Sequence, residues 1–294
     1  MASFSFFFAT FAHMKQAMIL AAGLGTRLKP LTDTMPKALV PVGGTPLLDL
    51  TVRRLAGQGY THFVVNVHHF AQQIKDYVSA NYSSGKIILD GEELPLQVSI
   101  SDETEQLLET GGALKKARCL FSEETPILIH NVDILDNVDY RRLSRQHQAD
   151  EDAVLVVSRR KTKRYLLFDN AMRLMGWVNT ETGEVKSPFQ WLREADFTID
   201  EQLEVRAPAG SSSFMLHSSL HAFAFSGIHS FSPRLFPLME RFPDRFSIID
   251  FYLSVCHRSR IVGLVKSDLQ VLDVGKLDSL EKAEDFVCSE VINR

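Results

Sequence analysis

Apolar runs alternate with amphipathic segments along the first part of the chain. Short apolar runs predict buried strands at residues 17–21, 63–67, 96–100, 126–131 and 153–158. Between them, apolar residues recur at helical spacing, which predicts helices at residues 46–58, 71–80, 112–120 and 139–148. Strands that alternate with helices predict an α/β fold, with an open, mainly parallel, Rossmann-like mixed sheet and helices on both faces.

The alternation stops after Arg159. Two short β-like runs, at residues 165–169 and 173–178, precede a polar stretch with prolines, serines and no clear period. We interpret residues 160–219 as an insertion, since long segments without regular pattern commonly carry function. Regular elements then return, with predicted strands at residues 222–229, 261–265 and 269–274 and predicted helices at residues 233–241, 248–258 (capped by Ser247) and 277–291.

The amino-terminal segment does not fit this pattern. It is apolar from Phe4 to Ala12, yet it lacks the positive charge that opens a signal peptide and is shorter than the ~20 residues that span a bilayer. We expect residues 1–13 to be an extension outside the fold, with a short membrane or partner anchor as the alternative. Residues 14–294 are expected to form a single domain that contains the insertion at about 160–219.

Charge and cysteine content narrow the function classes. The 294 residues include 32 Lys and Arg against 36 Asp and Glu, a net charge of −4, without the basic block that favours nucleic acid. Three cysteines without metal-like spacing predict buried thiols in a reducing compartment: Cys119, Cys256 and Cys288. We therefore expect a cytoplasmic protein, a monomer or small homo-oligomer, with neither nucleic acid nor a membrane as partner.

Candidate chemistry is concentrated after the first predicted strand, where residues 20–31 read LAAGLGTRLKPL. Gly23 and Gly25 are predicted to let the backbone turn with positive φ and bring amide groups against an anion. Residues 15–37 carry four cations against one anion: Lys15, Arg27, Lys29, Lys37 and Asp33. Positive charge beside a glycine loop at the end of a strand is typical of a polyphosphate site. A tight turn with solvated surface charges explains the spacing equally well.

Residues 20–31 and 35–48, the latter reading MPKALVPVGGTPLL, resemble the amino-terminal signature of the sugar-1-phosphate nucleotidyltransferases. Four later segments resemble other motifs of this family. LETGGA at 108–113 resembles its nucleobase loop, and FSGI at 225–228 resembles its sugar-contact strand. NVD at 131–133 and LDVG at 272–275 resemble the segments that carry its first and second metal aspartates. The resemblance covers roughly residues 14–294 apart from 179–219. It is strongest to the compact N-acetylmuramate-1-phosphate uridylyltransferase and mannose-1-phosphate guanylyltransferase-like members.

The resemblance implies that the chain transfers a nucleotidyl group from a nucleoside triphosphate, UTP or GTP, to a sugar-1-phosphate, with Mg²⁺ as cofactor. The product would be a nucleotide sugar for cell-wall or surface glycans. The implied catalytic residues are Arg27 and Lys37, and the implied metal ligands are Asp133 and Asp273. The implied nucleotide-binding residues are Leu20, Ala22, Gly23, Gly25, Thr26, Arg27, Glu109, Gly111, Gly112 and Asn131, and the implied sugar-binding residues are Gly227 and Asp133. The glycines of the nucleotide set are expected to give backbone amides or clearance to the nucleotide. Gly227 is expected to clear space for the sugar ring, with a bulge in the strand as the alternative, and the insertion at about 160–219 is expected to lie on the sugar side of the domain.

Such a reaction needs positioning and charge neutralisation rather than covalent catalysis by the protein. Arg27 is expected to neutralise the leaving pyrophosphate, because its forked donors suit bidentate contact with phosphate. Lys37 is expected to contact the phosphate of the sugar. Asp133 and Asp273 lie 140 positions apart, which does not prevent them from converging at strand ends in an open sheet. Either aspartate alone would more commonly be a turn or cap residue.

Some features depart from the pattern of the family. Val132 stands where relatives usually have glycine, Lys276 stands in place of the usual threonine, and the common glutamate-lysine-proline sugar motif is not visible. These departures leave open a catalytically silent homologue that binds nucleotide sugars as a regulatory subunit. A glycosyltransferase with an aspartate-bound metal is a second alternative, against which the G-x-G-x-R loop argues. Four histidines are interpreted as surface or core residues rather than metal ligands: His68, His69, His217 and His221.

Overall fold

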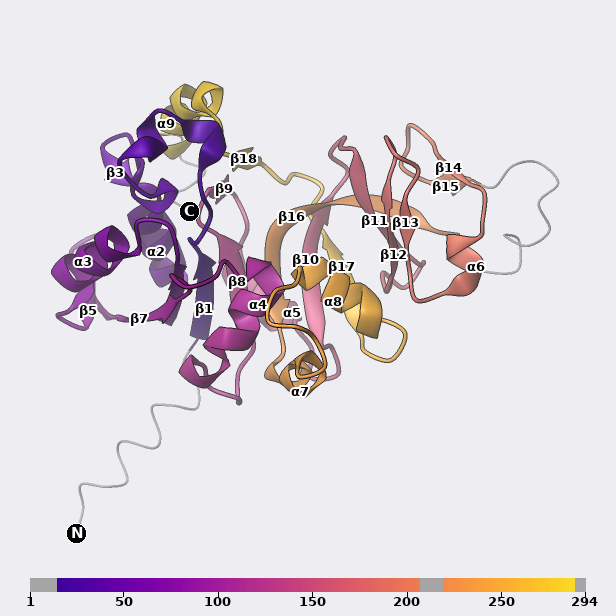
Figure 1. Cartoon of the computed structure of the whole chain (residues 1–294), viewed down its shortest axis with the longest axis horizontal. Helices are drawn as coiled ribbons and strands as arrows, with labels where there is room; N and C mark the ends of the chain where they lie inside the picture. Colours follow the sequence, from indigo (N-terminus) through magenta and orange to yellow (C-terminus); the bar gives the residue numbers. More distant parts are fainter. Residues whose placement is uncertain (1–14, 207–218, 289–294) are drawn as a thin grey trace, which may run out of the picture.

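The computed structural model describes residues 15–206 and 219–288, and its centre is a ten-stranded mixed sheet (Figure 1). In order across the sheet, the strands are β13 (Val185–Lys186), β12 (Leu174–Asn179), β11 (Arg164–Phe168), β16 (His221–Phe231), β8 (Ile127–Asn131), β1 (Lys15–Leu20), β4 (Tyr60–Val67) and β7 (Gln97–Asp102). Strand β10 (Ala153–Ser158) pairs with β16, and β17 (Ile261–Val265) pairs with β10. The predicted α/β fold is confirmed.

The core of the sheet is parallel. Strand β1 pairs in parallel with both β4 and β8, and β4 pairs in parallel with β7, so the carboxyl ends of these four strands lie at one edge. Strand β16 runs antiparallel between β8 and β10. The alternation of strands and helices therefore predicted the parallel core, whereas the long return strand that separates β8 from β10 carries no local signal of its direction.

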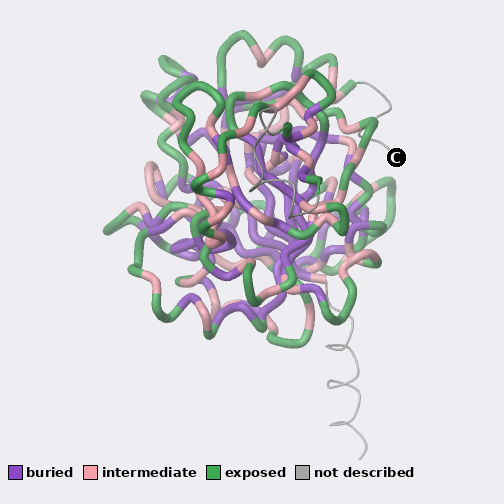
Figure 2. The backbone as a smooth tube through the Cα atoms, turned by 90° about the vertical axis from the view of Figure 1, so that its right-hand side faces the viewer, coloured by how far each residue is buried: buried purple, intermediate pink, exposed green. Residues whose placement is uncertain are grey.

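Helices cover both faces of the sheet, as expected. One face packs against α2 (Leu47–Gly57), α3 (Ala71–Tyr82) and α5 (Tyr140–Gln146), and the same hydrophobic core includes Ala283 of α9 (Leu280–Cys288). The other face packs against α4 (Glu109–Lys116), α7 (Phe236–Met239) and α8 (Ile248–Val255). The buried backbone forms a continuous centre between these layers (Figure 2). Ser247 caps α8 as predicted, because its hydroxyl accepts a hydrogen bond from the N–H of Ile249 at 3.2 Å.

Several predicted elements are shorter in the structure. The helix expected at 233–241 is a 3₁₀ turn, η6 (Pro233–Leu235), followed by the short α7. Pro237 lacks the N–H that would bond the carbonyl of Pro233, so a continuous α-helix cannot form there. The helix expected at 112–120 instead begins earlier, at Glu109, and its last turn is the 3₁₀ helix η5 (Ala117–Leu120). The strand expected at 269–274 is β18 (Val271–Asp273), and the end of the helix expected to reach residue 291 lies outside the described residues.

Four small pairs of strands lie outside the main sheet. Two of them are the hairpin β5 (Lys86–Leu89) with β6 (Glu92–Pro95), which was not predicted, and β18 with β9 (Ile134–Asp136). The other two pairs are β2 (Pro41–Val42) with β3 (Thr45–Pro46), and β14 (Thr198–Ile199) with β15 (Val205–Arg206). The β18–β9 pair is the one that shapes the site described below.

The region interpreted as an insertion contributes strands to the main sheet. Strands β11, β12 and β13 continue the sheet antiparallel beyond β16. The helix α6 (Gln190–Arg193) packs on this part of the sheet in a separate small core that includes Leu167, Val178 and Leu192. Figure 1 places β11 to β15 at the opposite end of the molecule from α2, α3 and α9. The proposed role of residues 160–219 at the sugar stays a prediction.

The prediction of buried cysteines is wrong for two of the three thiols. Cys119 and Cys288 are exposed, and Cys256 is partly buried. Each of these thiols is free. No helix in residues 15–206 and 219–288 is long and apolar enough to cross a membrane. The amino-terminal segment 1–13 lies outside the described residues.

His229 on β16 is buried, and neither of its ring nitrogens has a hydrogen-bond partner among the described residues. Its ring packs against Tyr252 at 5.6 Å and Phe225 at 5.5 Å. Burial lowers its pKa to about 3. In the unfolded chain the imidazole binds a proton below pH ~6.5, whereas in the native state it does not until pH ~3, so stability falls as pH falls through this window.

In the wild type, this histidine is expected to lower the free energy of unfolding by about 1.4 kcal/mol for each pH unit below pH ~6.5. The replacement His229→Phe is expected to abolish this contribution. Urea denaturation at pH 7.5 and pH 5 should show a smaller difference in unfolding free energy for this variant than for the wild type. The exposed His257 offers a control, because His257→Phe should leave the acid dependence unchanged. An equal acid dependence in His229→Phe and the wild type would contradict the prediction.

Candidate active site

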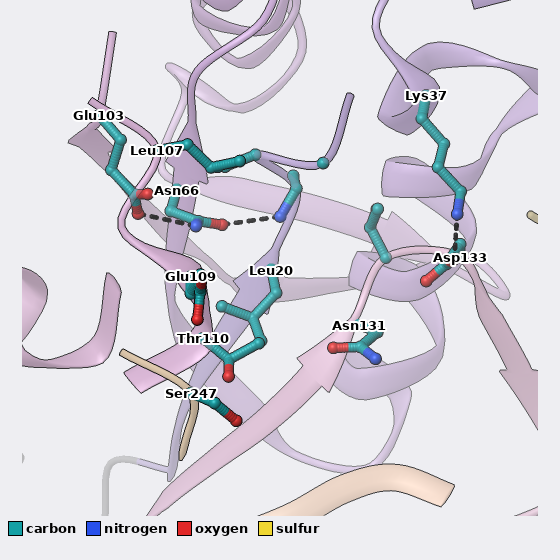
Figure 3. Close-up of a pocket in the computed structure, with 14 residues that line it drawn as sticks. Leu20, Lys37, Asn66, Glu103, Leu107, Glu109, Thr110, Asn131, Asp133 and Ser247 are labelled. Atoms are coloured by element: carbon teal, nitrogen blue, oxygen red, sulfur yellow. Dashed lines mark hydrogen bonds and ion pairs between the residues drawn. The ribbon is translucent and has the colours of Figure 1, made fainter. Parts of the chain in front are cut away.

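The carboxyl ends of β1, β4 and β8 open into a cavity of about 430 Å³ (Figure 3). The lining residues are Leu20, Ala21, Ala22, Gly23, Lys37, Asn66, Glu103, Leu107, Glu109, Thr110, Asn131, Val132, Asp133 and Ser247. Half of them belong to the predicted set: Leu20, Ala22, Gly23, Lys37, Glu109, Asn131 and Asp133. The largest group of predicted residues thus lies where an open sheet normally binds its ligand.

The loop after β1 turns at Gly25. This glycine has φ +64°, and a Cβ added to it would lie 2.8 Å from Cγ2 of Thr32. The hydroxyl of Thr32 donates to the Gly25 carbonyl at 2.8 Å, and the turn continues as η2 (Thr26–Leu28). The prediction of positive φ is therefore right for Gly25 and wrong for Gly23, because the loop reverses at Gly25 and the η2 turn. Gly23 lines the cavity with open space beside it.

Lys37 and Asp133 form an ion pair at one end of the cavity (Figure 3). Lys37 begins η4 (Lys37–Leu39) after the extended Pro36, and it is 8 % exposed. Asp133 follows β8 by two positions. The lysine Nζ contacts the Oδ2 atom of the aspartate. A lysine and a carboxylate that are both largely shielded from water interact more strongly than a surface pair.

Asp273 reaches the same place through the β18–β9 pair. Asp273 lies opposite Ile134 in this antiparallel pair, and the N–H of Val274 donates to the carbonyl of Asp133 at 2.8 Å. A guanidinium nitrogen of Arg27 lies 3.4 Å from the Asp273 carboxylate. The four charged residues predicted for catalysis and metal binding therefore lie together, although they come from three separate parts of the chain.

Gly275 lies at the centre of this group and was not predicted as a site residue. A Cβ added to it would lie 2.5 Å from Oδ1 of Asp273, 2.6 Å from Nη2 of Arg27 and 3.0 Å from Nζ of Lys37. Its N–H donates to Asp273 Oδ1 at 2.7 Å. The sequence signal was the glycine of the LDVG segment. The absence of a side chain lets the charged atoms of Asp273, Arg27 and Lys37 approach the backbone together at this position.

The two aspartates are the residues that could hold a metal ion. No group of three or more His, Cys, Asp or Glu side chains suited to a metal occurs in the part of the chain that the structure describes. Two carboxylates nevertheless fit Mg²⁺, which prefers oxygen ligands and usually keeps several waters or substrate phosphates in its shell. The space that a Cβ at Gly275 would fill lies against the Asp273 carboxylate. The donor set of Asp133 and Asp273 thus suits a hard divalent cation.

Gly111 and Gly112 pack the start of α4 against residues 244–246. Their N–H groups donate to the carbonyl of Phe246 at 2.9 and 3.2 Å. A Cβ on Gly111 would collide with the Phe246 ring, and one on Gly112 would collide with the Asp244 carbonyl. Their amides are therefore not available to a nucleotide, which corrects that expectation. Clearance for the nucleobase is the part of the prediction that remains.

Glu109 and Thr110, together with Leu107, line the cavity from this loop (Figure 3). Glu109 has φ +62° and pairs with Arg245 at 2.9 Å. The Thr110 hydroxyl accepts from the N–H of Ile248 at 3.0 Å, which joins the loop to α8. Thr110 was not predicted, because the family motif drew attention to the glycines next to it.

Gly227 lies at a bulge of β16, where the register with β10 shifts. It has φ +84°, and a Cβ there would lie 2.7 Å from Nδ2 of Asn131. The glycine therefore makes room for Asn131, which lines the cavity. A strand bulge, one of the two predicted explanations, is present, and contact with a sugar stays a prediction. Thr26 lies in η2, outside the cavity lining.

The departures from the family pattern have local explanations. Val132 is 3 % exposed, packs in the core and donates its N–H to the Leu20 carbonyl at 3.2 Å. Lys276 is exposed and precedes η7 (Leu277–Ser279). Three of the four histidines lie in the described residues, and each contacts another residue of the chain. His68 Nδ1 lies 2.6 Å from the Glu103 carbonyl oxygen, and the His69 ring centroid lies 4.1 Å from that of Phe70. His221 Nδ1 lies 2.7 Å from Oε2 of Glu204. His217 lies outside the described residues.

Comparison with known proteins gives a family match. The family described as nucleotidyl transferase matches residues 16–165, half of the chain. N-acetylmuramate alpha-1-phosphate uridylyltransferase from Caulobacter vibrioides is 44 % identical over 119 residues, which are 40 % of this chain and 46 % of the relative. Mannose-1-phosphate guanyltransferase from Neurospora crassa is 32 % identical over 153 residues, 51 % of this chain and 39 % of the relative. In each of these two relatives, the matched part covers less than half of the relative's own length.

Solved structures share the fold over nearly the whole chain. HddC from Yersinia pseudotuberculosis superposes with a TM-score of 0.59 at 22 % identity, over 92 % of this chain and 99 % of that one. The inositol-1-phosphate CTP transferase from T. maritima superposes with a TM-score of 0.66 at 14 % identity, over 96 % of this chain and 97 % of that one. The chain belongs to the nucleotidyl transferase family, as the resemblance of residues 20–48 predicted.

Proposed function

We propose that the chain transfers a nucleotidyl group from UTP or GTP to a sugar-1-phosphate and releases pyrophosphate, as a step in making cell-wall or surface-glycan precursors. The observation that carries the proposal is the convergence of Arg27, Lys37, Asp133 and Asp273 around Gly275, beside a cavity of about 430 Å³. Relatives named as uridylyl- and guanyltransferases of sugar-1-phosphates support it. One solved HddC structure is a complex with GMP-PN, which supports a nucleotide in the cavity.

The reaction forms one bond and breaks one. An oxygen of the sugar phosphate attacks the α-phosphorus, and the bond from this phosphorus to the bridging oxygen of the β-phosphate breaks. We assign the sugar phosphate to Lys37, because its Nζ lines the cavity beside Asp133 and is largely shielded from water. We assign the leaving pyrophosphate to Arg27, because its side chain is the more exposed of the two cations and its forked donors suit bidentate contact with phosphate.

We further propose Mg²⁺ as the cofactor, held by Asp133 and Asp273. When bound, the ion would supply charge neutralisation at the reacting phosphates. The protein contributes positive charge at the same place, because each of the two cations already lies against one of the two carboxylates. Phosphate oxygens that bind Arg27 and Lys37 would free the carboxylates for the cation. The cluster therefore exchanges internal ion pairs for contacts with its ligands.

The cellular setting is proposed from the charge and the thiols of the chain. A net charge of −4 argues against nucleic acid as a partner, and free thiols suit the reducing cytoplasm. We propose a monomer or a small homo-oligomer that works on small phosphorylated substrates without a membrane partner.

Arg27→Lys is expected to lower kcat/KM by about tenfold or more, although the charge is kept. Lysine presents one ammonium group where arginine presents a fork, so bidentate contact with the pyrophosphate oxygens is lost. Pyrophosphate release measured against nucleotide concentration checks this. Arg241→Lys, at an exposed position, is the control. An unchanged kcat/KM in Arg27→Lys would mean that Arg27 only solvates the surface.

The function itself is tested by a matrix of the four nucleoside triphosphates against a panel of sugar-1-phosphates, with pyrophosphate release measured with and without Mg²⁺. We expect metal-dependent turnover with UTP or GTP and at least one sugar-1-phosphate. Binding of a nucleotide sugar without turnover for any pair would favour the regulatory homologue. The family match argues against the glycosyltransferase alternative.

A further inference from the structure

Two buried polar side chains link the loops on either side of the nucleotide cavity. Asn66 lies near the end of β4, between β1 and β7 in the sheet. Its Oδ1 accepts from the N–H of Ala21 at 2.7 Å, and its Nδ2 donates to Oε1 of Glu103 at 2.8 Å (Figure 3). The other carboxylate oxygen, Oε2, accepts from the N–H of Leu108 at 3.2 Å.

This chain of hydrogen bonds has a defined start and end. Ala21 is the first residue after β1 and opens the glycine loop, and Leu108 is the residue from which α4 and its Glu109–Thr110 segment begin. The Leu108 carbonyl in turn accepts from the N–H of Phe246 at 3.2 Å. The two loops expected to hold the phosphates and the base are thereby tied through Asn66 and Glu103.

Glu103 is fully buried and Asn66 is 3 % exposed, so both links are shielded from water. Burial raises the pKa of Glu103 above its ordinary value, which shows that the fold places a carboxyl group at a position that disfavours its charge. Its backbone is fixed as well, because its N–H donates to the Val67 carbonyl at 2.8 Å. A buried polar group of this kind rigidifies its surroundings when every donor and acceptor is satisfied.

We propose that Glu103 and Asn66 are positioning residues, which set the separation of the two loops and so the affinity for the nucleoside triphosphate. The inference rests on the proposed function, since it assumes that a nucleotide occupies this cavity. Neither residue was predicted from the sequence motifs. The Lys37–Asp133 pair lies at the other end of the cavity in Figure 3, so the hydrogen-bonded link through Asn66 and Glu103 is expected to act on the nucleotide and not on the sugar phosphate.

The test uses two single variants and their combination. In Glu103→Gln, the amide offers one acceptor and one donor group, so either Asn66 or Leu108 meets a donor in place of an acceptor. In Asn66→Asp, two carboxylates face each other. In the double variant, the amide at position 103 donates to the carboxylate at position 66, while the N–H groups of Ala21 and Leu108 keep their acceptors. The hydrogen bond between positions 66 and 103 is then reversed in direction, while the number of hydrogen bonds and the net charge stay the same.

We expect each single variant to raise the Kd for UTP or GTP by about tenfold and the double variant to bind within about twofold of the wild type. The KM for the sugar-1-phosphate should stay unchanged in all three. Isothermal titration calorimetry with the nucleotide alone measures the Kd, and steady-state kinetics measure the KM for the sugar-1-phosphate. Glu103→Gln removes a buried charge, so it is expected to remain folded and to report on affinity rather than on unfolding.

Glu151→Gln is the matched control. Glu151 is 7 % exposed and accepts the N–H of Gln148 at 3.0 Å, and it does not line the cavity. This variant should leave the nucleotide Kd unchanged. Unchanged nucleotide affinity in both single variants, or a double variant that regains the Tm of the wild type without regaining nucleotide affinity, would overturn the inference. A wild-type protein that binds no nucleotide would instead overturn the proposed function.

Discussion

Asp273→Asn is expected to lower turnover on the order of 10³-fold while the protein stays folded. The Asp273 side chain is 48 % exposed and lies 3.4 Å from Arg27. Asparagine keeps its shape and can still accept the N–H of Gly275, so the substitution removes a negative charge and little else. Pyrophosphate release over a series of Mg²⁺ concentrations, together with the Tm, measures both parts of the prediction.

Asp133→Asn is expected to reduce turnover to a similar extent and also to lower the Tm. Asp133 is the partner of the largely buried Lys37, and loss of this partner leaves a shielded ammonium group without its counter-charge. Asp278→Asn is the control, because this exposed aspartate follows Asp273 by five positions and changes the net charge equally. Near-normal turnover in either test variant would remove that aspartate from the site.

The sequence was sufficient to place the four charged residues in one site. Arg27, Lys37 and Asp133 each follow a predicted strand at the edge where parallel strands end, and that rule alone brings them near one another. Asp273 is different, because it depends on the pairing of β18 with β9. Pairs of three residues have no local pattern strong enough to predict, so only the resemblance of the LDVG segment connected Asp273 with Asp133.

For Gly111 and Gly112, the family motif correctly indicated a position beside the cavity, but it did not indicate why a glycine is required there. Gly111 and Gly112 lie beside the cavity, but they are required by the close approach of residues 244–246, and their amides bond to Phe246. That contact joins segments more than a hundred positions apart. A family motif marks such glycines without saying which neighbour excludes a side chain, and the neighbour is known only from the fold.

The link through Asn66 and Glu103 could not be predicted from the pattern of apolar and polar positions. Asn66 interrupts an apolar strand, and Glu103 follows the polar end of β7, where a glutamate is ordinarily exposed. Asn66 is buried within the sheet between β1 and β7, and the carboxylate of Glu103 is buried between Asn66 and the N–H of Leu108. Long-range packing of this kind also placed β16 antiparallel between β8 and β10.

Lys37→Met is expected to lower kcat/KM by about 10²–10³-fold. Methionine retains the apolar stem of the side chain, which is 10 % exposed, and removes the charge that lies against Asp133. Kinetics with the sugar-1-phosphate varied at saturating nucleotide measure the effect at the phosphate that Lys37 is proposed to hold. Lys29→Met is the control, because Lys29 lies in the same loop with a 60 % exposed side chain and loses the same charge.

The double variant Lys37→Met/Asp133→Asn separates catalysis from stability. Each single change leaves one member of a shielded ion pair without its partner, which lowers the Tm, whereas the double change leaves neither charge behind. The Tm of the double variant is therefore expected to return toward that of the wild type, while its turnover stays at the level of the slower single variant. If turnover recovers together with the Tm, Lys37 and Asp133 form a structural ion pair, and the reaction must be served by other residues of the cavity.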